Sequence, residues 1–299
     1  MKKFLLGSIA LVALNVGSAL AADLARPVYK APPPPPPPVY SWTGCYVGVN
    51  AGGIWSRNNN VDTVGTPISA AATFNAEAAV GARLATNSVA ANSNGFIGGG
   101  QIGCNYQITN WVVWGVEADL DGVAKRNNTN SLTVVSGVPG FPTETFTSTT
   151  TVSKSLDFLG TVRGRIGFLA TPSTLVYATG GFAYGGVRSS TSILQTDTGI
   201  LPGPVAVAYS STASISQTRL GWTVGAGAES MLWGNWSAKF EYLYYNLGSV
   251  TYTLPNLVAN APTFAAPTWV VGAQSTTRFN GSIIRLGLNY KFGPVGPTY

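Results

Sequence analysis

The sequence predicts an all-β chain in which eight antiparallel strands close into an up-and-down transmembrane β-barrel with long extracellular loops. The clearest strand is the last one, residues 278–292, where apolar side chains recur at every second position. Because the side chains of a strand alternate between its faces, this segment has one apolar and one polar face. The apolar face is long enough to cross a bilayer and ends in aromatics, as at a membrane interface. Its members are Ile284, Leu286, Leu288, Tyr290 and Phe292.

The connections between the predicted strands support the same fold. Alternating segments predict strands at residues 41–53, 95–106, 110–122, 155–169, 173–187, 217–231, 235–247 and 278–292. The connections at 107–109, 170–172 and 232–234 are short, whereas those at 54–94, 123–154, 188–216 and 248–277 are long and polar. Long irregular loops argue against a compact soluble domain. Short periplasmic turns that alternate with long extracellular loops are typical of outer-membrane barrels, as is an even number of strands.

Charged residues segregate to one face of these strands. The charge-free faces carry Val112, Trp114, Val116, Ala118 and Leu120; Leu156, Phe158, Val162, Ile166 and Phe168; Leu220, Trp222, Val224, Ala226 and Ala228; and Trp236, Ala238, Phe240, Tyr242 and Tyr244. The opposite faces carry Glu117, Asp119, Asp121, Asp157, Arg163, Arg165, Arg219, Glu229, Lys239, Glu241, Arg285 and Lys291. A lipid-facing Arg or Lys costs about 2–4 kcal/mol at the midplane, so the apolar faces should point outward. Residues 173–187 fit either phase, and a soluble lipocalin-like barrel would reverse the pattern.

The N-terminus predicts export from the cytoplasm. A basic start, the apolar run 4–16 and the small-residue site 19–21 are typical of a signal peptide over residues 1–21, cleaved between Ala21 and Ala22. An uncleaved anchor helix is the alternative, but the run is short for one. Residues 22–39 form a proline-rich periplasmic segment that could contact the peptidoglycan layer. The barrel is expected over residues 40–292, followed by a tail at 293–299.

Composition excludes several classes of function. The chain has 17 Lys and Arg against 11 Asp and Glu, but the basic residues are scattered, so no nucleic-acid partner is expected. It has no His, which removes the usual catalytic base and the imidazole ligand of haem or zinc. The glycines of residues 98–103 match a dinucleotide fingerprint but lie within a predicted strand, where they make room for large neighbours such as Tyr46. Asp119 and Asp121 lack the other ligands of a calcium loop. We therefore predict no catalytic residue, cofactor or metal.

Four inward-facing charges lie at similar expected heights in the barrel. They are Glu117, Arg163, Glu241 and Arg285. The lumen of an eight-stranded barrel is only just wide enough for side chains, and buried charges require partners. We predict a salt-bridge network that plugs the lumen, with an ion gate or a catalytic carboxylate pair as the alternative.

The two cysteines fall on the same face of adjacent predicted strands. Antiparallel pairing would bring Cys45 and Cys104 together at the periplasmic end of the barrel. The periplasm is oxidising, so a disulfide forms if the register brings the Cβ atoms to about 4 Å. The alternative is two free thiols that face lipid as small apolar residues.

Several motifs resemble one family. The segment Trp42-Thr-Gly-Cys-Tyr-Val-Gly-Val-Asn-Ala-Gly52 and the segments 95–103, 114–119, 159–167, 177–185 and 236–245 resemble alphaproteobacterial outer-membrane immunogenic proteins of the RopB type, in the OmpA-like barrel group. The last strand also resembles the signal read by the barrel-assembly machinery, on the residues Arg285, Gly287, Tyr290 and Phe292. The resemblance implies that the secretion apparatus and this machinery are partners.

The expected function is a non-enzymatic, structural and surface-antigen role in the outer membrane of a Gram-negative cell. Outer-membrane lipid and lipopolysaccharide are the expected surroundings and partners of the barrel. Two alternatives remain open. One is a narrow porin-like channel, and the other is an adhesin or receptor that acts through the extracellular loops.

Overall fold

The computed structural model describes residues 40–69, 75–125, 129–198, 206–259 and 269–292. The chain divides into two units, Met1–Pro37 and Pro38–Tyr299, and all described residues belong to the second. The predicted signal peptide with its Ala21–Ala22 cleavage site, the proline-rich segment and the tail at 293–299 lie outside the described residues.

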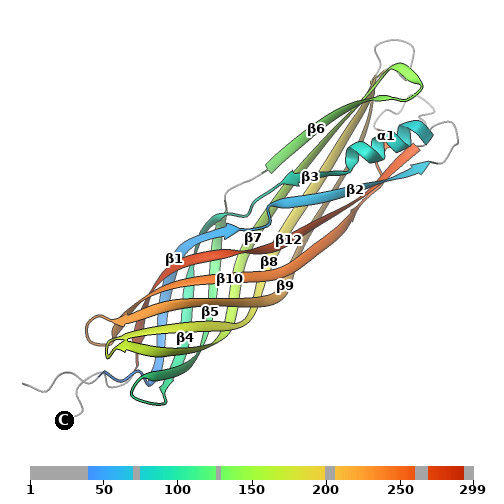
Figure 1. The fold of residues 1–299 in the computed structure, drawn as a ribbon. Helices are drawn as coiled ribbons and strands as arrows, with labels where there is room; N and C mark the ends of the chain where they lie inside the picture. The colour runs from blue at the N-terminus through green and yellow to red at the C-terminus, as the bar shows by residue number, and fades with distance from the viewer. Residues whose placement is uncertain (1–39, 70–74, 126–128, 199–205, 260–268, 293–299) are drawn as a thin grey trace, which may run out of the picture. The chain divides into compact units, whose positions relative to one another are not determined.

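Eight antiparallel strands form a closed ring, as predicted (Figure 1). The first and last strands pair directly, with Val47 opposite Tyr290, and this pairing closes the ring. The strands of the ring are β1 (Gly44–Ser56), β4 (Gly95–Gln107), β5 (Val112–Lys125), β7 (Phe141–Thr171), β8 (Thr174–Thr198), β9 (Ala206–Met231), β10 (Trp236–Leu254) and β12 (Trp269–Lys291).

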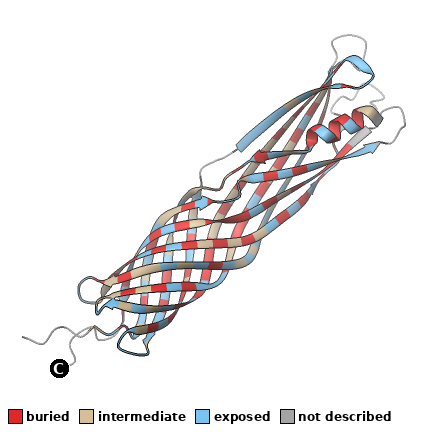
Figure 2. Cartoon of the chain, viewed as in Figure 1, coloured by how far each residue is buried: buried red, intermediate tan, exposed pale blue. Residues whose placement is uncertain are grey.

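Buried and exposed residues alternate along each strand, as Figure 2 shows. The predicted lipid-facing residues lie on the outer wall, with one exception. Leu156 was predicted to face outward, and this is wrong because it is buried inside the barrel. An irregularity between Leu156 and Phe158 adds one residue to β7, as a β-bulge does, and shifts the phase of the strand. Asp157, predicted to face inward, therefore pairs with the exposed Arg188 at 2.6 Å.

Strand β8, whose phase the sequence left open, has a clear orientation. Leu175, Tyr177 and Ala183 are buried inside the barrel, whereas Phe182 is exposed on the outer wall. Phe182 and its outward neighbour Tyr184 have ring centroids 6.4 Å apart. The odd-numbered residues of this strand therefore point inward.

The four connections that were predicted to be long loops consist largely of strands and a helix. The predicted ends of the neighbouring strands were therefore wrong. Strand β7 has 31 residues, β9 has 26 and β8 has 25. Four further strands and a helix lie in the same regions: β2 (Asn60–Ser69), β3 (Asn87–Ala90), β6 (Thr129–Val138), β11 (Val258–Ala259) and α1 (Asn75–Ala85). Strand β6 pairs with β7, β2 with β12, β3 with β2, and β11 with β9. The many Thr, Ser and Val residues here suit a half-exposed strand.

We call this part of the structure the extension. It comprises the described residues within 57–94, 129–156, 187–218 and 247–278. Its interior is mainly apolar, with a few buried charges among the apolar side chains, whereas the interior of the ring below is mainly charged. The buried apolar residues include Phe146, Ile193, Tyr209, Tyr252, Leu254 and Val271.

Helix α1 packs into the apolar interior of the extension. Its buried face carries Ala78, Ala82, Leu84 and Ala85. A Cβ atom added at Gly81 would lie 3.0 Å from Cγ2 of Val271, so a glycine permits this close approach. Among the described residues, no helix is long and apolar enough to cross a membrane.

A group of three acidic side chains is buried beneath α1. Glu77 comes from the helix, Glu144 from β7 and Asp197 from β8, and each is at most 3% exposed. Burial raises the pKa of Asp197 to about 8, helped by a hydrogen bond and by the negative charge of Glu144. Burial also raises the pKa of Glu144. At neutral pH at least one of these carboxyls therefore holds a proton.

Candidate functional site: the charged interior of the ring

The strand register places the four predicted network residues at one level. Glu117 of β5 lies opposite Arg163 of β7, and Glu241 of β10 lies opposite Arg285 of β12. In an antiparallel sheet, residues directly opposite share a face, so all four side chains enter the lumen together. The structure brings these four residues to one level because the apolar face of each of their strands points outward and the opposite face points into the lumen.

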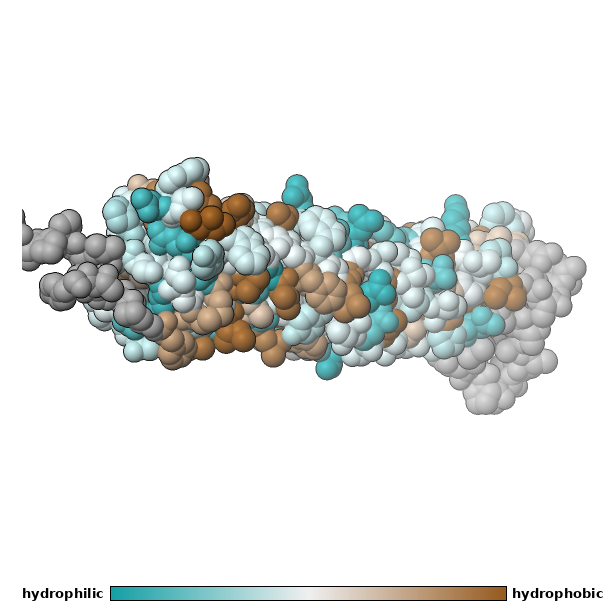
Figure 3. Space-filling view, turned by 90° about the horizontal axis from the view of Figure 1, so that it is seen from below, coloured by the Kyte–Doolittle hydropathy of each residue, from teal (hydrophilic) through white to brown (hydrophobic). Residues whose placement is uncertain are grey.

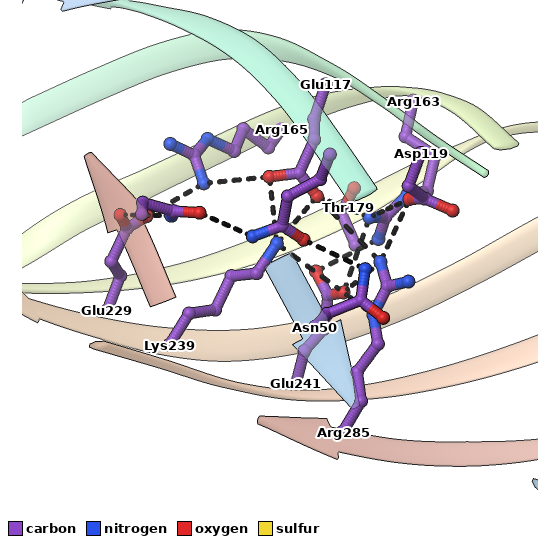
Figure 4. A network of polar contacts seen from close by, with 12 residues as sticks. Asn50, Glu117, Asp119, Arg163, Arg165, Thr179, Glu229, Lys239, Glu241 and Arg285 are labelled. Carbon is purple, nitrogen blue, oxygen red and sulfur yellow. Dashed lines mark hydrogen bonds and ion pairs between the residues drawn. The ribbon is translucent and has the colours of Figure 1, made fainter. Parts of the chain in front are cut away.

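The structure joins the four side chains by ion pairs (Figure 4). Arg163 Nη2 lies 2.5 Å from Glu117 Oε1, and Arg163 Nη1 lies 2.9 Å from Glu241 Oε1. Arg285 Nη2 lies 2.7 Å from Glu241 Oε2 and 3.9 Å from Glu117 Oε1. All four residues are at most 3% exposed, so water does not screen these pairs.

Five further charged residues belong to the same network. Arg285 pairs with two further carboxylates, with Asp121 through Nη1 at 2.6 Å and with Asp119 through Nη2 at 2.9 Å. Asp119 also pairs with Arg163 at 2.9 Å. Lys239 pairs with Glu117 at 2.8 Å, and Arg165 pairs with Glu229 at 3.0 Å. The sequence placed these side chains on the inward faces but not in the network. Asp119, Arg165 and Lys239 each lie two residues from a predicted member on the same face of its strand, and this was the available signal. Asp121 lies four residues from Glu117, and the strand of Glu229 holds no predicted member.

Two tyrosines complete the hydrogen bonding. The Tyr46 hydroxyl donates to Glu117 Oε2 at 2.5 Å, and the Tyr177 hydroxyl donates to Glu241 Oε1 at 3.0 Å. The Arg165 guanidinium lies over both rings, 4.9 and 5.2 Å from their centroids, within the range of a cation–π interaction. A Cβ at Gly103 would lie 2.3 Å from the Tyr46 oxygen, which confirms the predicted role of this glycine.

All eight strands of the ring take part in this hydrogen-bonded layer. The contributing residues include Tyr46 of β1, Gln101 of β4, Glu117 of β5, Arg163 of β7, Tyr177 of β8, Glu229 of β9, Glu241 of β10 and Arg285 of β12. Gln101 joins through Asn289, which donates to Glu229 at 2.8 Å. Side-chain hydrogen bonds and ion pairs therefore connect every strand of the ring to the network in the lumen.

Cys45 and Cys104 lie opposite each other on β1 and β4, and the structure joins them in a disulfide. Their Cα atoms are 3.9 Å apart, and both residues are exposed on the outer wall. The register thus meets the condition on which the sequence prediction depended.

Two belts of aromatic side chains surround the outer wall. The lower girdle, near the short turns, contains Tyr106, Trp111, Trp114, Phe168, Trp233, Trp236, Tyr290 and Phe292. The upper girdle, next to the extension, contains Trp55, Phe158, Tyr184, Trp222, Tyr242 and Tyr244. Between the girdles, the outward positions of the described ring strands carry no charge. Figure 3 shows one face of this surface, with apolar side chains gathered away from the extension. This pattern is typical of a barrel that spans a bilayer.

The residues of the predicted assembly signal lie near the lower girdle and inside the ring. Tyr290 is exposed on the outer wall, with its ring centroid 5.2 Å from that of Trp236 and 5.6 Å from that of Phe292. Arg285 faces the lumen, and Gly287 lies on the same inward face.

Comparisons with known proteins find a matching family model, sequence relatives and similar solved structures. Residues 9–292 match the family model described as outer membrane protein beta-barrel domain. The chain is 34% identical over 292 residues to the 31 kDa outer-membrane immunogenic protein of Brucella melitensis, covering 98% of this chain and all of that protein. It is 24% identical over 294 residues to the 25 kDa outer-membrane immunogenic protein of Brucella abortus, covering 98% and 99% of the two chains. Among solved structures, the outer membrane protein OprG from Pseudomonas aeruginosa is similar at 12% identity with a TM-score of 0.39, covering 85% of this chain and 99% of that chain.

Proposed function

The chain belongs to the outer membrane protein β-barrel family, and on that premise we propose that it has a non-enzymatic, non-conducting role as a structural protein and surface antigen of the cell envelope. The outer membrane of a Gram-negative cell is its location. The absence of His from the sequence supports a role without acid–base catalysis.

The charged layer across the lumen carries this proposal. A ring of eight strands leaves an interior just wide enough for side chains. Four cations and five carboxylates are buried there, and each is held by at least one ion pair. A hydrated ion would have to displace several of these pairs at once. The barrel therefore presents a closed cross-section rather than a pore.

The extension supports the surface role. It lies beyond the upper girdle, at the end of the barrel where long connections join the strands, and that end faces outward in outer-membrane barrels. Its regular strands and helix give antibodies an ordered surface to bind. Two relatives are named as immunogenic proteins, which agrees with a surface-exposed extension.

Planar-bilayer recording tests the closed cross-section. The native protein should give no conductance steps. A variant with Glu117, Arg163, Glu241 and Arg285 all replaced by alanine should conduct, because it removes large side chains while leaving the net charge unchanged. Regular steps from the native protein would favour a channel and overturn the proposal. A folded alanine variant that stays closed would show that another part of the barrel blocks the lumen.

The residues near the lower girdle suggest a partner during biogenesis. We propose that the barrel-assembly machinery recognises the last strand through Arg285, Gly287, Tyr290 and Phe292. The outward Tyr290 and Phe292 side chains are available to such a partner before the strand closes the ring. Replacing Phe292 by alanine should lower the amount of folded barrel in the outer membrane, measured by gel mobility before and after heating.

A further inference from the structure

A polar hollow lies on the outer wall, next to the upper girdle. It has a volume of about 530 Å³ and is lined by Arg57, Asn58, Asn59, Asn60, Asp62 and Arg278. The chain reaches it directly after Trp55, the last outward aromatic of β1. On β12, the strand that carries Arg278, Ser282 forms a hydrogen bond at 2.9 Å with the hydroxyl of Tyr242, which belongs to the upper girdle. The hollow therefore sits just outside the apolar belt, where the headgroups of the outer leaflet begin.

Two guanidinium groups in this hollow are unpaired among the described residues. In the described part of the chain, the structure gives no ion pair or side-chain hydrogen bond to Arg57 or Arg278. The other described arginines all have a side-chain contact: Arg83, Arg163, Arg165, Arg188, Arg219 and Arg285. Asp62 also lines the hollow, but it accepts a hydrogen bond from Ser88 at 2.6 Å. Its carboxylate forms no ion pair with the two guanidiniums among these residues.

A buried lysine adds positive charge behind the hollow. Lys154 Nζ donates to the backbone oxygen of Asn58 at 2.7 Å and to that of Arg278 at 2.5 Å. Lys154 is 3% exposed, and within the described residues it has no carboxylate partner. Its charge is therefore directed toward the two segments that carry the arginines. The hollow itself is lined by two arginines and one carboxylate, and burial lowers the pKa of Lys154 behind it to about 8.

The backbone holds these groups in place before any ligand binds. Arg57 N donates to Asn280 O at 3.0 Å, and Asn58 N donates to Asn280 Oδ1 at 3.3 Å. These bonds fix the segment between β1 and β2 against β12, so both arginines project from a defined surface. A preorganised site loses less conformational entropy when it binds a ligand.

We propose that this hollow, the Arg57–Arg278 site, binds a phosphate group on the sugar head of an outer-leaflet glycolipid. Guanidinium groups pair with phosphate oxygens through two parallel hydrogen bonds, and basic pockets at a membrane surface bind anionic headgroups. The neighbouring Asn side chains supply donors and acceptors for sugar hydroxyls. The inference goes beyond the proposed function and depends only on the location of the barrel in the outer membrane.

Binding of defined lipids to the detergent-solubilised full-length protein tests the site. The probes are diphosphoryl lipid A, dephosphorylated lipid A with the same acyl chains, and inorganic pyrophosphate. The variant R57Q/R278Q should weaken binding of diphosphoryl lipid A by roughly tenfold or more, because two charge-assisted contacts are lost. R188Q is the matched control, because Arg188 is an exposed arginine already paired with Asp157. Its affinity should stay within about twofold of the native value.

Three results would overturn the proposal. Equal affinity of the native protein and R57Q/R278Q for diphosphoryl lipid A would remove the two arginines as its ligands. Equal affinity for dephosphorylated lipid A would show that acyl chains alone account for binding. Arginine-dependent binding of pyrophosphate as tight as that of lipid A would replace the glycolipid by a free phosphate compound. Gel mobility before and after heating verifies that each variant is folded, and the single variant R57Q repeats the test if the double variant is not.

Discussion

Replacement of Arg163 by methionine tests how far the charged layer stabilises the barrel. Methionine keeps an unbranched side chain and removes the guanidinium, which pairs with Glu117 at 2.5 Å and with Asp119 and Glu241 at 2.9 Å. Removing one partner of a buried ion pair costs about 3–5 kcal/mol. Lys239 and Arg285 still contact the freed carboxylates, so we expect a loss near the lower value, about 3 kcal/mol. That loss raises the unfolding equilibrium constant by roughly a hundredfold.

Urea unfolding in lipid vesicles measures this change, with the folded fraction read from gel mobility without heating. Arg188→Met is the control, because the Arg188–Asp157 pair has the same chemistry at 2.6 Å but its arginine side chain is 59% exposed. An exposed pair contributes about 0–1 kcal/mol, so this variant should unfold close to the native urea concentration. Equal midpoints for the two variants would refute the reasoning, because burial would then make no difference to the strength of the pairs.

The remaining predictions concern separate parts of the structure. Replacing both Cys45 and Cys104 by serine should lower the free energy of unfolding by about 4 kcal/mol, because in the chain-entropy model the bond closes a loop with a sequence separation of 59 residues. Two reactive thiols in the denatured, unreduced native protein would contradict the disulfide itself. The pKa of Asp197 is raised from 3.8 to about 8, so its contribution to stability is full below pH 3.8 and is lost as the pH rises through 8. Hydrogen exchange in the extension should therefore speed up between about pH 4 and pH 8 beyond its intrinsic pH dependence, and Asp197→Asn should abolish this excess. Gly103→Val should reduce the folded fraction because a Cβ there would lie 2.3 Å from the Tyr46 hydroxyl oxygen and 2.8 Å from the backbone oxygen of Val116. Tyr46→Ala in the same chain removes only the first overlap, so it should restore part of the folded fraction; no rescue at all would show that the Val116 backbone dominates the conflict.

The sequence predicted the ring because lipid imposes a simple rule on its outer wall. An outward charge in a bilayer is costly, so the apolar face of each strand is free of charge and the opposite face can be identified. This reasoning put Glu117, Arg163, Glu241 and Arg285 on inward faces at similar heights, and the register of the structure then shows which of them lie opposite each other. The sequence could not show how far each side chain reaches, so the contacts of Arg285 with Asp119 and Asp121 were not predicted.

The errors occurred where that rule does not apply. At Asp157 one inserted residue changes the phase of β7, and periodicity alone cannot reveal a bulge until the register is known. Beyond the upper girdle the outer wall meets water, so Thr, Ser and Asn occupy the exposed positions of β6 and β7. Such strands have the composition of loops, and this is why the extension was predicted to be irregular. Helix α1 was missed because its buried face consists mostly of small alanine side chains, which give only a weak apolar periodicity, although alanine itself favours a helix.

The reversal of polarity along the barrel fixes the depth at which the protein sits. Below the upper girdle the apolar side chains face outward, and above it they face inward around Phe146 and Val271. Moving the barrel by one pair of residues shifts it by roughly 7 Å along the strands. An inward shift would bring Arg57 and Arg278 toward hydrocarbon, and an outward shift would expose the apolar belt to water. Either displacement raises the free energy. The pattern of outward side chains therefore keeps the barrel at one depth in the membrane even where the thickness of the bilayer varies.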